Sequence, residues 1–100
     1  MFQWLKTLFQ DRTFGAIRNS AWPKLRDWYF RKNPFCEVCG KRAKEIHHIV
    51  PVHIDNSKEL EISNLISLCR RHHFEIGHFF NFRSYNKDIK EWVDKIKNKP

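Results

Sequence analysis

Cysteine, glycine and long apolar runs are all scarce in this sequence. The chain has only three cysteines, which cannot all pair with one another, so a complete disulfide framework is excluded. No apolar run approaches the roughly 20 residues that a membrane-spanning helix needs. The opening segment carries Lys6, Asp11 and Arg12 and lacks a small-residue cleavage site, which argues against a signal peptide. We therefore expect a cytoplasmic protein with no membrane partner.

The chain is also short, and its length limits the core that it can build. One hundred residues fit a single domain and leave no room for a second. A domain of this size buries only about 60–70% of its unfolded surface, so it often depends on a metal or a disulfide. In a reduced compartment, Cys-x-x-Cys spacing points to a metal.

Acidic residues are few relative to basic ones. The chain carries 19 Lys and Arg against 11 Asp and Glu, for a net charge of +8 and a pI near 9.7. Residues 18–44 hold eight basic and two acidic residues, whereas residues 45–69 hold one basic and four acidic residues. This balance makes an acidic polymer the first partner to consider. A solvated basic surface with no partner would have the same composition.

Hydrophobic periodicity predicts a small β-hairpin among helices, and therefore an α+β fold. Asn19 and Ser20 are candidate caps of a helix that ends at Asn33, and Pro23 suits its first turn because a missing N–H costs little there. Helices are expected over 1–14, 20–33, 70–80 and 84–98, and strands over 45–50 and 65–68.

Two residue pairs have the spacing of zinc knuckles. Cys36 and Cys39 are separated by two residues, and Cys69 and His72 repeat that spacing further along the chain. Four soft or borderline ligands suit a closed tetrahedral Zn²⁺ site, which would tie together the two ends of the hairpin segment. The alternative is that buried cysteines merely fill space. Because His72 and His73 are adjacent, either imidazole is a candidate for the fourth ligand.

Three histidines and an asparagine form a second candidate site. His47 and His48 lie on a predicted strand, Asn64 precedes the next strand, and His73 begins the following helix. Neighbours on a strand point to opposite faces, so His47 and His48 can serve one small site only if the strand ends or twists there. The bend implied by Pro51 allows this. One imidazole would then bind a metal together with His73 while its neighbour acts on water.

In these residues the sequence resembles the HNH nuclease family, whose fold is the ββα-metal finger. The resemblance rests on HHIVP from His47, NLISLC from Asn64 and the His72-His73 pair, and it extends from about Trp22 to His78. It implies a zinc-stapled, treble-clef-like core over 34–80, with helical parts over 1–33 and 84–98. The arrangement is similar to that of small HNH endonucleases of bacteriophages and prophages.

The resemblance implies a role for each matching residue. His48 matches the general base that deprotonates the attacking water, and Asn64 matches the residue that fixes the loop between the strands. His47 and His73 match ligands of a catalytic divalent ion such as Mg²⁺, Mn²⁺ or Ni²⁺. The zinc-ligand positions of the family fall on Cys36, Cys39, Cys69 and His72. The implied activity is metal-dependent cleavage of DNA by an endonuclease or nickase, with phage terminase proteins as further partners.

Two positions depart from the family pattern. His47 stands where Asp is common, as in the colicin-type DNases, and imidazole favours softer ions than carboxylate does. His72 stands where a fourth cysteine is more usual. His78 is an extra candidate ligand, but it lies about 500° around an α-helix from His73 and is off the same face unless Gly77 breaks the helix.

Basic residues around the core are candidate DNA contacts, expected to meet phosphates rather than to read bases. They are Arg18, Lys24, Arg26, Lys41, Arg42, Arg70 and Arg71. His53 lies in a polar loop and is expected to be exposed. Most aromatic residues are expected in the core, and stacking on single-stranded bases would require exposed rings. The competing interpretation is a zinc-stapled DNA-binding module that does not cut, but such a module has no need of His48.

Overall fold

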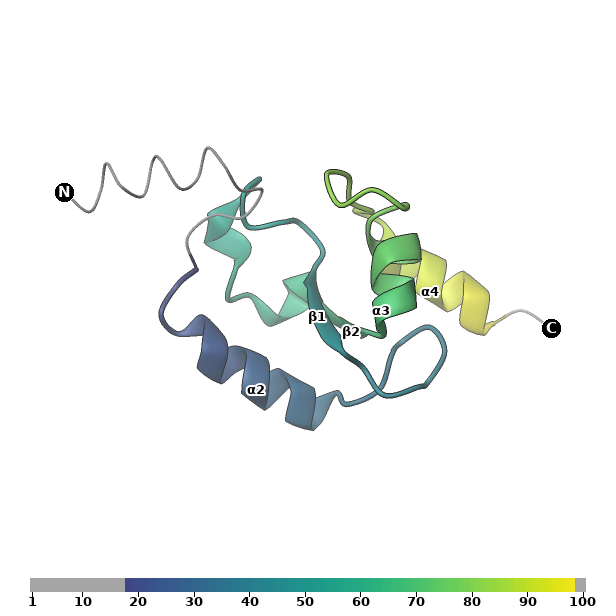
Figure 1. Cartoon of the computed structure of the whole chain (residues 1–100), viewed down its shortest axis with the longest axis horizontal. Coiled ribbons are helices and arrows are strands. Elements are labelled where there is room, and N and C mark those ends of the chain that lie inside the picture. The colour runs from purple at the N-terminus through teal and green to yellow at the C-terminus, as the bar shows by residue number, and fades with distance from the viewer. Residues whose placement is uncertain (1–17, 99–100) are drawn as a thin grey trace.

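The computed structural model describes residues 18–98, so the helix expected over 1–14 lies outside the described residues (Figure 1). Two antiparallel strands followed by a helix confirm the predicted α+β class. No helix among residues 18–98 has the length and apolar character needed to cross a membrane. The elements are α2 (Trp22–Lys32), β1 (Glu45–His48), the 3-10 turns η1 (Asn56–Lys58) and η2 (Ile62–Asn64), β2 (Leu65–Leu68), α3 (Arg70–His72), the π-helical turn η3 (His73–Gly77) and α4 (Ile89–Lys97).

Helix α2 forms where the sequence predicts it, with one correction at its start. Pro23 lies in the first turn and the helix ends before Asn33. The N-cap is Ala21, not Asn19 or Ser20. The Asn19 side chain instead accepts a hydrogen bond from the Ala21 N–H at 2.8 Å, so it closes the turn that leads into the helix.

The two strands form a hairpin whose two faces have different partners. Glu45 pairs with Leu68 and His48 pairs with Leu65 at the two ends of the register. Side chains alternate across a sheet, so Ile46 and Leu65 share one face and pack against Trp22 and Tyr29 of α2. The Tyr29 hydroxyl donates to the Leu65 carbonyl at 3.1 Å, which fastens the helix to this face.

The opposite face of the hairpin packs against α4 and the first cysteine knuckle. Ile66 and Leu68 of β2 lie in one cluster with Ile89 and Val93 of α4, and the cluster includes the buried Cys36. A two-stranded hairpin is marginal by itself in water and needs such partners on its faces. The order of layers is therefore α2, hairpin, and then α3, η3 and α4 together (Figure 1).

Two elements are shorter than the sequence predicts, and hydrogen bonds to asparagine side chains explain both. Strand β1 ends at His48 instead of residue 50 because the Val50 N–H donates to Asn64 Oδ1 at 2.9 Å. Helix α4 begins at Ile89 instead of residue 84. The Asp88 N–H donates to Oδ1 of the buried Asn86, whose own N–H donates to the Gly77 carbonyl.

Candidate metal centres and catalytic cleft

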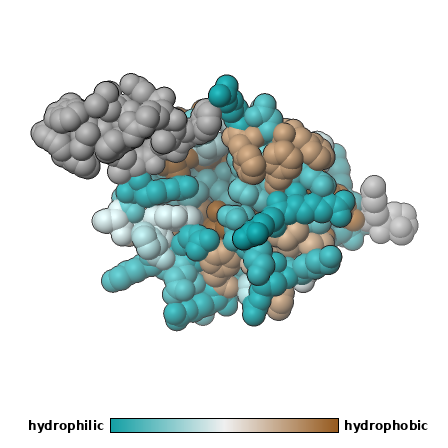
Figure 2. All heavy atoms as spheres, in the orientation of Figure 1, coloured by the Kyte–Doolittle hydropathy of each residue, from teal (hydrophilic) through white to brown (hydrophobic). Residues whose placement is uncertain are grey.

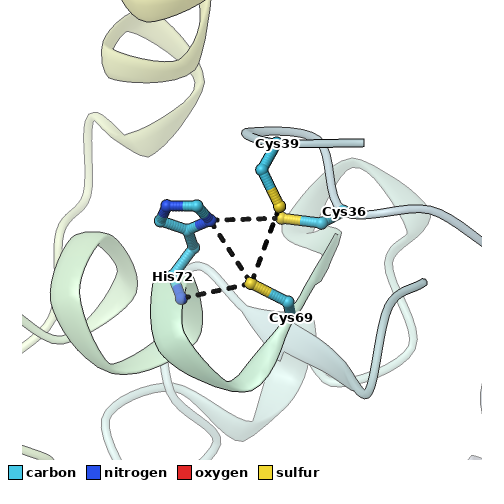
Figure 3. Close-up of side chains that lie close together, drawn as sticks. All are labelled: Cys36, Cys39, Cys69 and His72. Atoms are coloured by element: carbon cyan, nitrogen blue, oxygen red, sulfur yellow. Dashed lines mark hydrogen bonds between the residues drawn. The ribbon is translucent and has the colours of Figure 1, made fainter. Parts of the chain in front are cut away.

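Three cysteines and one histidine meet between the first knuckle and the start of α3. Their ligand atoms all lie within 4.8 Å of one another (Figure 3). Cys36 and Cys39 come from the turn after α2, whereas Cys69 is the N-cap of α3 and His72 is its last residue. Of the two adjacent imidazoles, His72 belongs to this cluster and the next histidine belongs to another.

The spacing of the sulfur and nitrogen atoms suits zinc, and all three cysteines are free thiols in this structure. The Sγ atoms of Cys39 and Cys69 are 3.9 Å apart, and His72 Nδ1 is 3.3 Å from Cys69 Sγ and 3.7 Å from Cys36 Sγ. Ligands of a tetrahedral zinc ion, with Zn–S of about 2.3 Å and Zn–N of about 2.1 Å, lie roughly 3.5–3.8 Å apart. These four residues therefore fit a structural zinc ion.

The backbone around the knuckles supports thiolate ligands. The N–H of Val38 donates to Cys36 Sγ at 3.4 Å, and the N–H of His72 donates to Cys69 Sγ at 3.5 Å. Gly40 closes the first knuckle at a φ of +78°, a conformation that glycine adopts without a Cβ clash. Such N–H donors stabilise the negative charge that a metal-bound sulfur carries.

A second cluster consists of three imidazoles. His47 comes from β1, His73 begins η3, and His78 follows the end of η3. The Nε2 atoms of His73 and His78 are 3.1 Å apart, and the ring centroids of all three residues lie 4.7–4.9 Å from one another. Ligand nitrogens about 2.1 Å from a metal ion lie roughly 3.0–3.4 Å apart, depending on the coordination geometry.

Two further observations show that this triad fits a metal ion. His47 is 2% exposed, and its Nε2 has no hydrogen-bond partner among the described residues, a deficit that a metal ion would remove. The Nδ1–H of His78 donates to the Ser84 carbonyl at 2.7 Å, which leaves the Nε2 lone pair directed at the cluster. His47, His73 and His78 would therefore hold the ion.

The three imidazoles are neutral near pH 7, as metal ligands must be. Burial, followed by the neighbouring imidazoles of His73 and His78, lowers the pKa of His47 to about 2. Burial, followed by His78, lowers the pKa of His73 to about 4, and burial also lowers the pKa of His78. Each neutral imidazole thus has a lone pair that can bind a metal ion without first losing a proton.

The π-helical turn explains why His78 joins the cluster. Counting at 3.6 residues per turn places it off the face of His73. The segment His73–Gly77 is wound as a π-helix, whose hydrogen bonds span five residues, so positions 73 and 78 return to the same side. The expectation of a continuous α-helix over 70–80 is therefore wrong, and the wider turn brings in a third imidazole.

Gly77 permits the close packing of His47 against η3. A Cβ at residue 77 would lie 3.2 Å from Cε1 and 3.3 Å from Nε2 of His47. These contacts are tight enough to push the ring by a few tenths of an ångström.

Gly77→Ala is therefore expected to weaken metal binding at the triad by roughly tenfold. This is the usual loss of metal affinity when a group that orients a ligand is changed. Alanine otherwise favours a helix, so thermal stability should be retained. Titration of the zinc-loaded protein with Ni²⁺ or Mn²⁺ by calorimetry measures the effect, and an unchanged Kd would contradict it.

His48 lies beside the triad but does not belong to it. Its Nε2 is 2.9 Å from the Glu59 carbonyl oxygen, and its Nδ1 is 3.4 Å from Nη1 of Arg18. The carbonyl only accepts and the guanidinium only donates, so both partners select the tautomer with a proton on Nε2 and a lone pair on Nδ1. Burial is the largest cause that lowers the pKa of His48, which favours the neutral imidazole.

Glu59 supports this arrangement, and sequence reasoning missed it. Its side chain is buried, accepts hydrogen bonds from the Asn19 N–H at 3.1 Å and lies 3.9 Å from Nη1 of Arg18. The residue thus links the start of α2 to the backbone oxygen that holds His48. In the sequence it is one of several acidic residues of a polar loop, and no pattern distinguishes it from the others.

Asn64 fastens the loop between the strands. Its Oδ1 accepts from the Val50 N–H at 2.9 Å, and its Nδ2 donates to the carbonyls of Val50 and Lys58 at 3.1 and 3.2 Å. The residue is 6% exposed, so water cannot replace these bonds.

Asn64→Ala is expected to lower the free energy of unfolding by about 2–4 kcal/mol, because it leaves buried backbone groups unpaired. Asn56→Ala in the exposed turn η1 is the matched control and should change stability by less than about 0.5 kcal/mol. Urea unfolding of the zinc-loaded variants provides the comparison, and equal effects would contradict the assigned hydrogen bonds.

A cleft of about 270 Å³ opens over both histidine groups. Its lining includes the triad, His48, Arg18 and Phe82, together with the exposed His53. Because β1 ends at His48, neighbouring imidazoles from opposite faces of the strand reach one cleft.

Of the seven basic candidates, Arg18 lines this cleft. Arg26 lies over the Phe30 ring, Arg42 lies over the Phe35 ring, and Arg71 pairs with Glu75 at 2.9 Å. The exposed residues Lys24, Lys41 and Arg70 lie on α2, the first knuckle and α3. These cations are distributed over several elements and do not form one patch at the cleft.

Of three comparisons with known proteins, one found a match, and it covers the residues of both clusters. No curated protein and no solved structure matches the chain. Residues 36–78, which hold both candidate metal clusters, match the family model of the HNH endonucleases, and this match implies a nuclease activity.

Proposed function

We propose that the protein is a metal-dependent DNA endonuclease or nickase. The observation that carries the proposal is a single cleft lined by the triad of His47, His73 and His78 and by the separately held imidazole of His48. Metal-assisted phosphodiester hydrolysis needs a cation that contacts the phosphate and, beside it, a neutral imidazole that accepts a proton from the attacking water.

In this proposal His48 is the general base. Its Nδ1 lone pair accepts a proton from the attacking water while Nε2–H remains bonded to the Glu59 carbonyl, which fixes the ring. The contact of Arg18 with Nδ1 must yield to that water, and the guanidinium, which lies 3.9 Å from the Glu59 carboxylate, still has N–H donors for a phosphate oxygen. Asn64 keeps the loop that carries these groups in place.

A divalent cation held by His47, His73 and His78 would supply positive charge to the scissile phosphate and to the leaving oxygen. Burial of the triad strengthens that electrostatic contribution because the surroundings are poorly solvated. Three imidazole ligands favour Mn²⁺ or Ni²⁺ over Mg²⁺, which prefers oxygen ligands.

The proposed substrate is DNA, because the net charge of +8 favours a polyanion. The seven basic candidates would contact phosphates and position the duplex without reading its sequence. A phage gene, a terminase partner and a location in the bacterial host cytoplasm, all expected from the family resemblance, stay predictions.

Supercoiled plasmid distinguishes this proposal from a non-cutting DNA-binding module. The zinc-loaded protein should nick or linearise the plasmid when Mn²⁺ or Ni²⁺ is added and should leave it intact in the metal-free buffer. His73→Ala should lose that response while its zinc content stays the same. A wild-type protein that retards the plasmid on a gel but leaves it uncut with every metal would support the binding module instead.

A further inference from the structure

Four aromatic side chains remain exposed around the loop that follows η3. Phe79, Phe80, Phe82 and Trp92 are 41%, 65%, 54% and 43% exposed. Figure 2 shows an apolar patch on the upper right of the surface, over the region where Figure 1 draws this loop. A patch of this kind on a basic protein calls for an explanation, because exposed aromatic clusters mark interaction sites.

The loop holds two of these rings outward in an unfavourable backbone conformation. Phe79 and Phe80 have φ values of 51° and 66°, in the left-handed region that bulky residues avoid. The conformation is maintained by hydrogen bonds from the Phe80 N–H to the Phe74 carbonyl and from the Asn81 N–H to the His78 carbonyl. The Ser84 hydroxyl also donates to the His78 carbonyl. Strain that the surrounding structure maintains in this way is typical of functional segments.

The aromatic surface is continuous with the catalytic cleft. Phe82 lines the cleft, and its ring centroid is 5.0 Å from that of His78 and 5.8 Å from that of His73. Phe74 bridges Phe82 and Phe80 at centroid distances of 4.9 and 5.6 Å. The Phe74 ring thus separates Phe80 from Phe82 at the cleft, and Phe80 is not part of the metal site.

We propose that Phe80 and Phe82 form a stacking platform for unpaired bases of DNA next to the phosphate that the cleft binds. The inference rests on the proposed function, and it defines the substrate class as DNA with unpaired or unstacked bases beside the cleavage point. Every base has a face that can stack on an aromatic ring, and each such contact raises affinity by about five- to 150-fold. The position of the platform at the edge of a cleft with a metal site and Arg18 favours a nucleic acid as its occupant.

Phe80→Gly is the sharpest test, because glycine suits the φ of this position and the substitution removes only the ring. Binding is measured with a His48→Gln background, which slows cleavage, on a single-stranded oligonucleotide and on the intact duplex of the same sequence. We expect a five- to 150-fold loss of affinity for the single strand and little change for the duplex. Phe80→Tyr, which keeps an aromatic face, should restore binding, and Trp28→Ala on α2 serves as the exposed-aromatic control.

Three results would overturn the platform. The first is an unchanged affinity of Phe80→Gly for the single strand, and the second is an equal loss of affinity for the intact duplex. The third is a wild-type dimer that Phe80→Gly converts to a monomer while its DNA affinity is retained. The last result would assign the patch to a second copy of the chain. Failure of the wild-type protein to cut plasmid would instead refute the proposed function and would leave the single-strand affinity measurement valid.

Discussion

Cys39→Ser is expected to prevent zinc binding and to leave the protein unfolded at physiological temperature. Its thermal melt should therefore show no cooperative transition. Structural zinc contributes about 10–16 kcal/mol of apparent binding free energy in small zinc domains, which exceeds or matches the total stability of a typical domain. The hairpin here has only four residues in each strand and depends on the cluster to hold the knuckle and α3 together. Zinc content by mass spectrometry and a thermal melt by circular dichroism measure the two effects.

A comparison of serine variants at the two cysteines of the first knuckle distinguishes metal binding from simple packing. Cys36 is 3% exposed and belongs to the main core cluster, whereas Cys39 is exposed. If the cysteines only fill space, Cys36→Ser destabilises the protein and Cys39→Ser is harmless. If they bind zinc, both variants lose the metal and both unfold. A Cys39→Ser protein with unchanged melting and zinc content would refute the structural zinc site.

His48→Gln is expected to lower the rate of DNA cleavage by about 10²- to 10⁴-fold, the usual contribution of a general base. Glutamine can donate a hydrogen bond to the Glu59 carbonyl as the Nε2–H does, but it cannot accept a proton near neutral pH. The variant should therefore keep its fold and its metal content. Single-turnover cleavage of plasmid with saturating Mn²⁺ isolates this step from DNA binding.

His53→Gln is the matched control for that experiment. His53 is an exposed histidine on the same cleft, outside both metal clusters. Its substitution should change the cleavage rate by less than about threefold, in keeping with a surface position. Equal losses in the two variants would indicate a general effect of cleft histidines and would remove His48 from its role as the base.

Spacing along the chain predicted those parts of the structure that local chemistry determines. The two knuckle pairs have ligands separated by two intervening residues, so their cluster follows from the sequence once the hairpin closes. Ile89, Trp92, Val93 and Ile96 follow one another at helical spacing, and the helix expected over 84–98 rests on them; Ile89 and Val93 are buried in α4. Alternation along β1 predicted that His47 and His48 face opposite sides.

The remainder depended on contacts that sequence spacing does not encode. The inclusion of His78 in the triad follows from a π-helical turn, whereas periodicity reasoning assumes an α-helix. Glu59 becomes important only because α2 and the loop between the strands meet, which brings Asn19 and Arg18 to its carboxylate. The left-handed backbone at Phe79 and Phe80 also gives no sequence signal, because glycine is the residue expected there.

Anomalous diffraction from crystals of the zinc-loaded protein soaked in Ni²⁺ tests whether the cysteine cluster and the imidazole triad bind two separate metal ions. Data collected at the nickel and zinc absorption edges should give one zinc peak among Cys36, Cys39, Cys69 and His72. They should also give a separate nickel peak between the Nε2 atoms of His47, His73 and His78. A nickel peak confined to the cysteine cluster, or three imidazoles with no metal between them at millimolar Ni²⁺, would show that the triad is not a metal site.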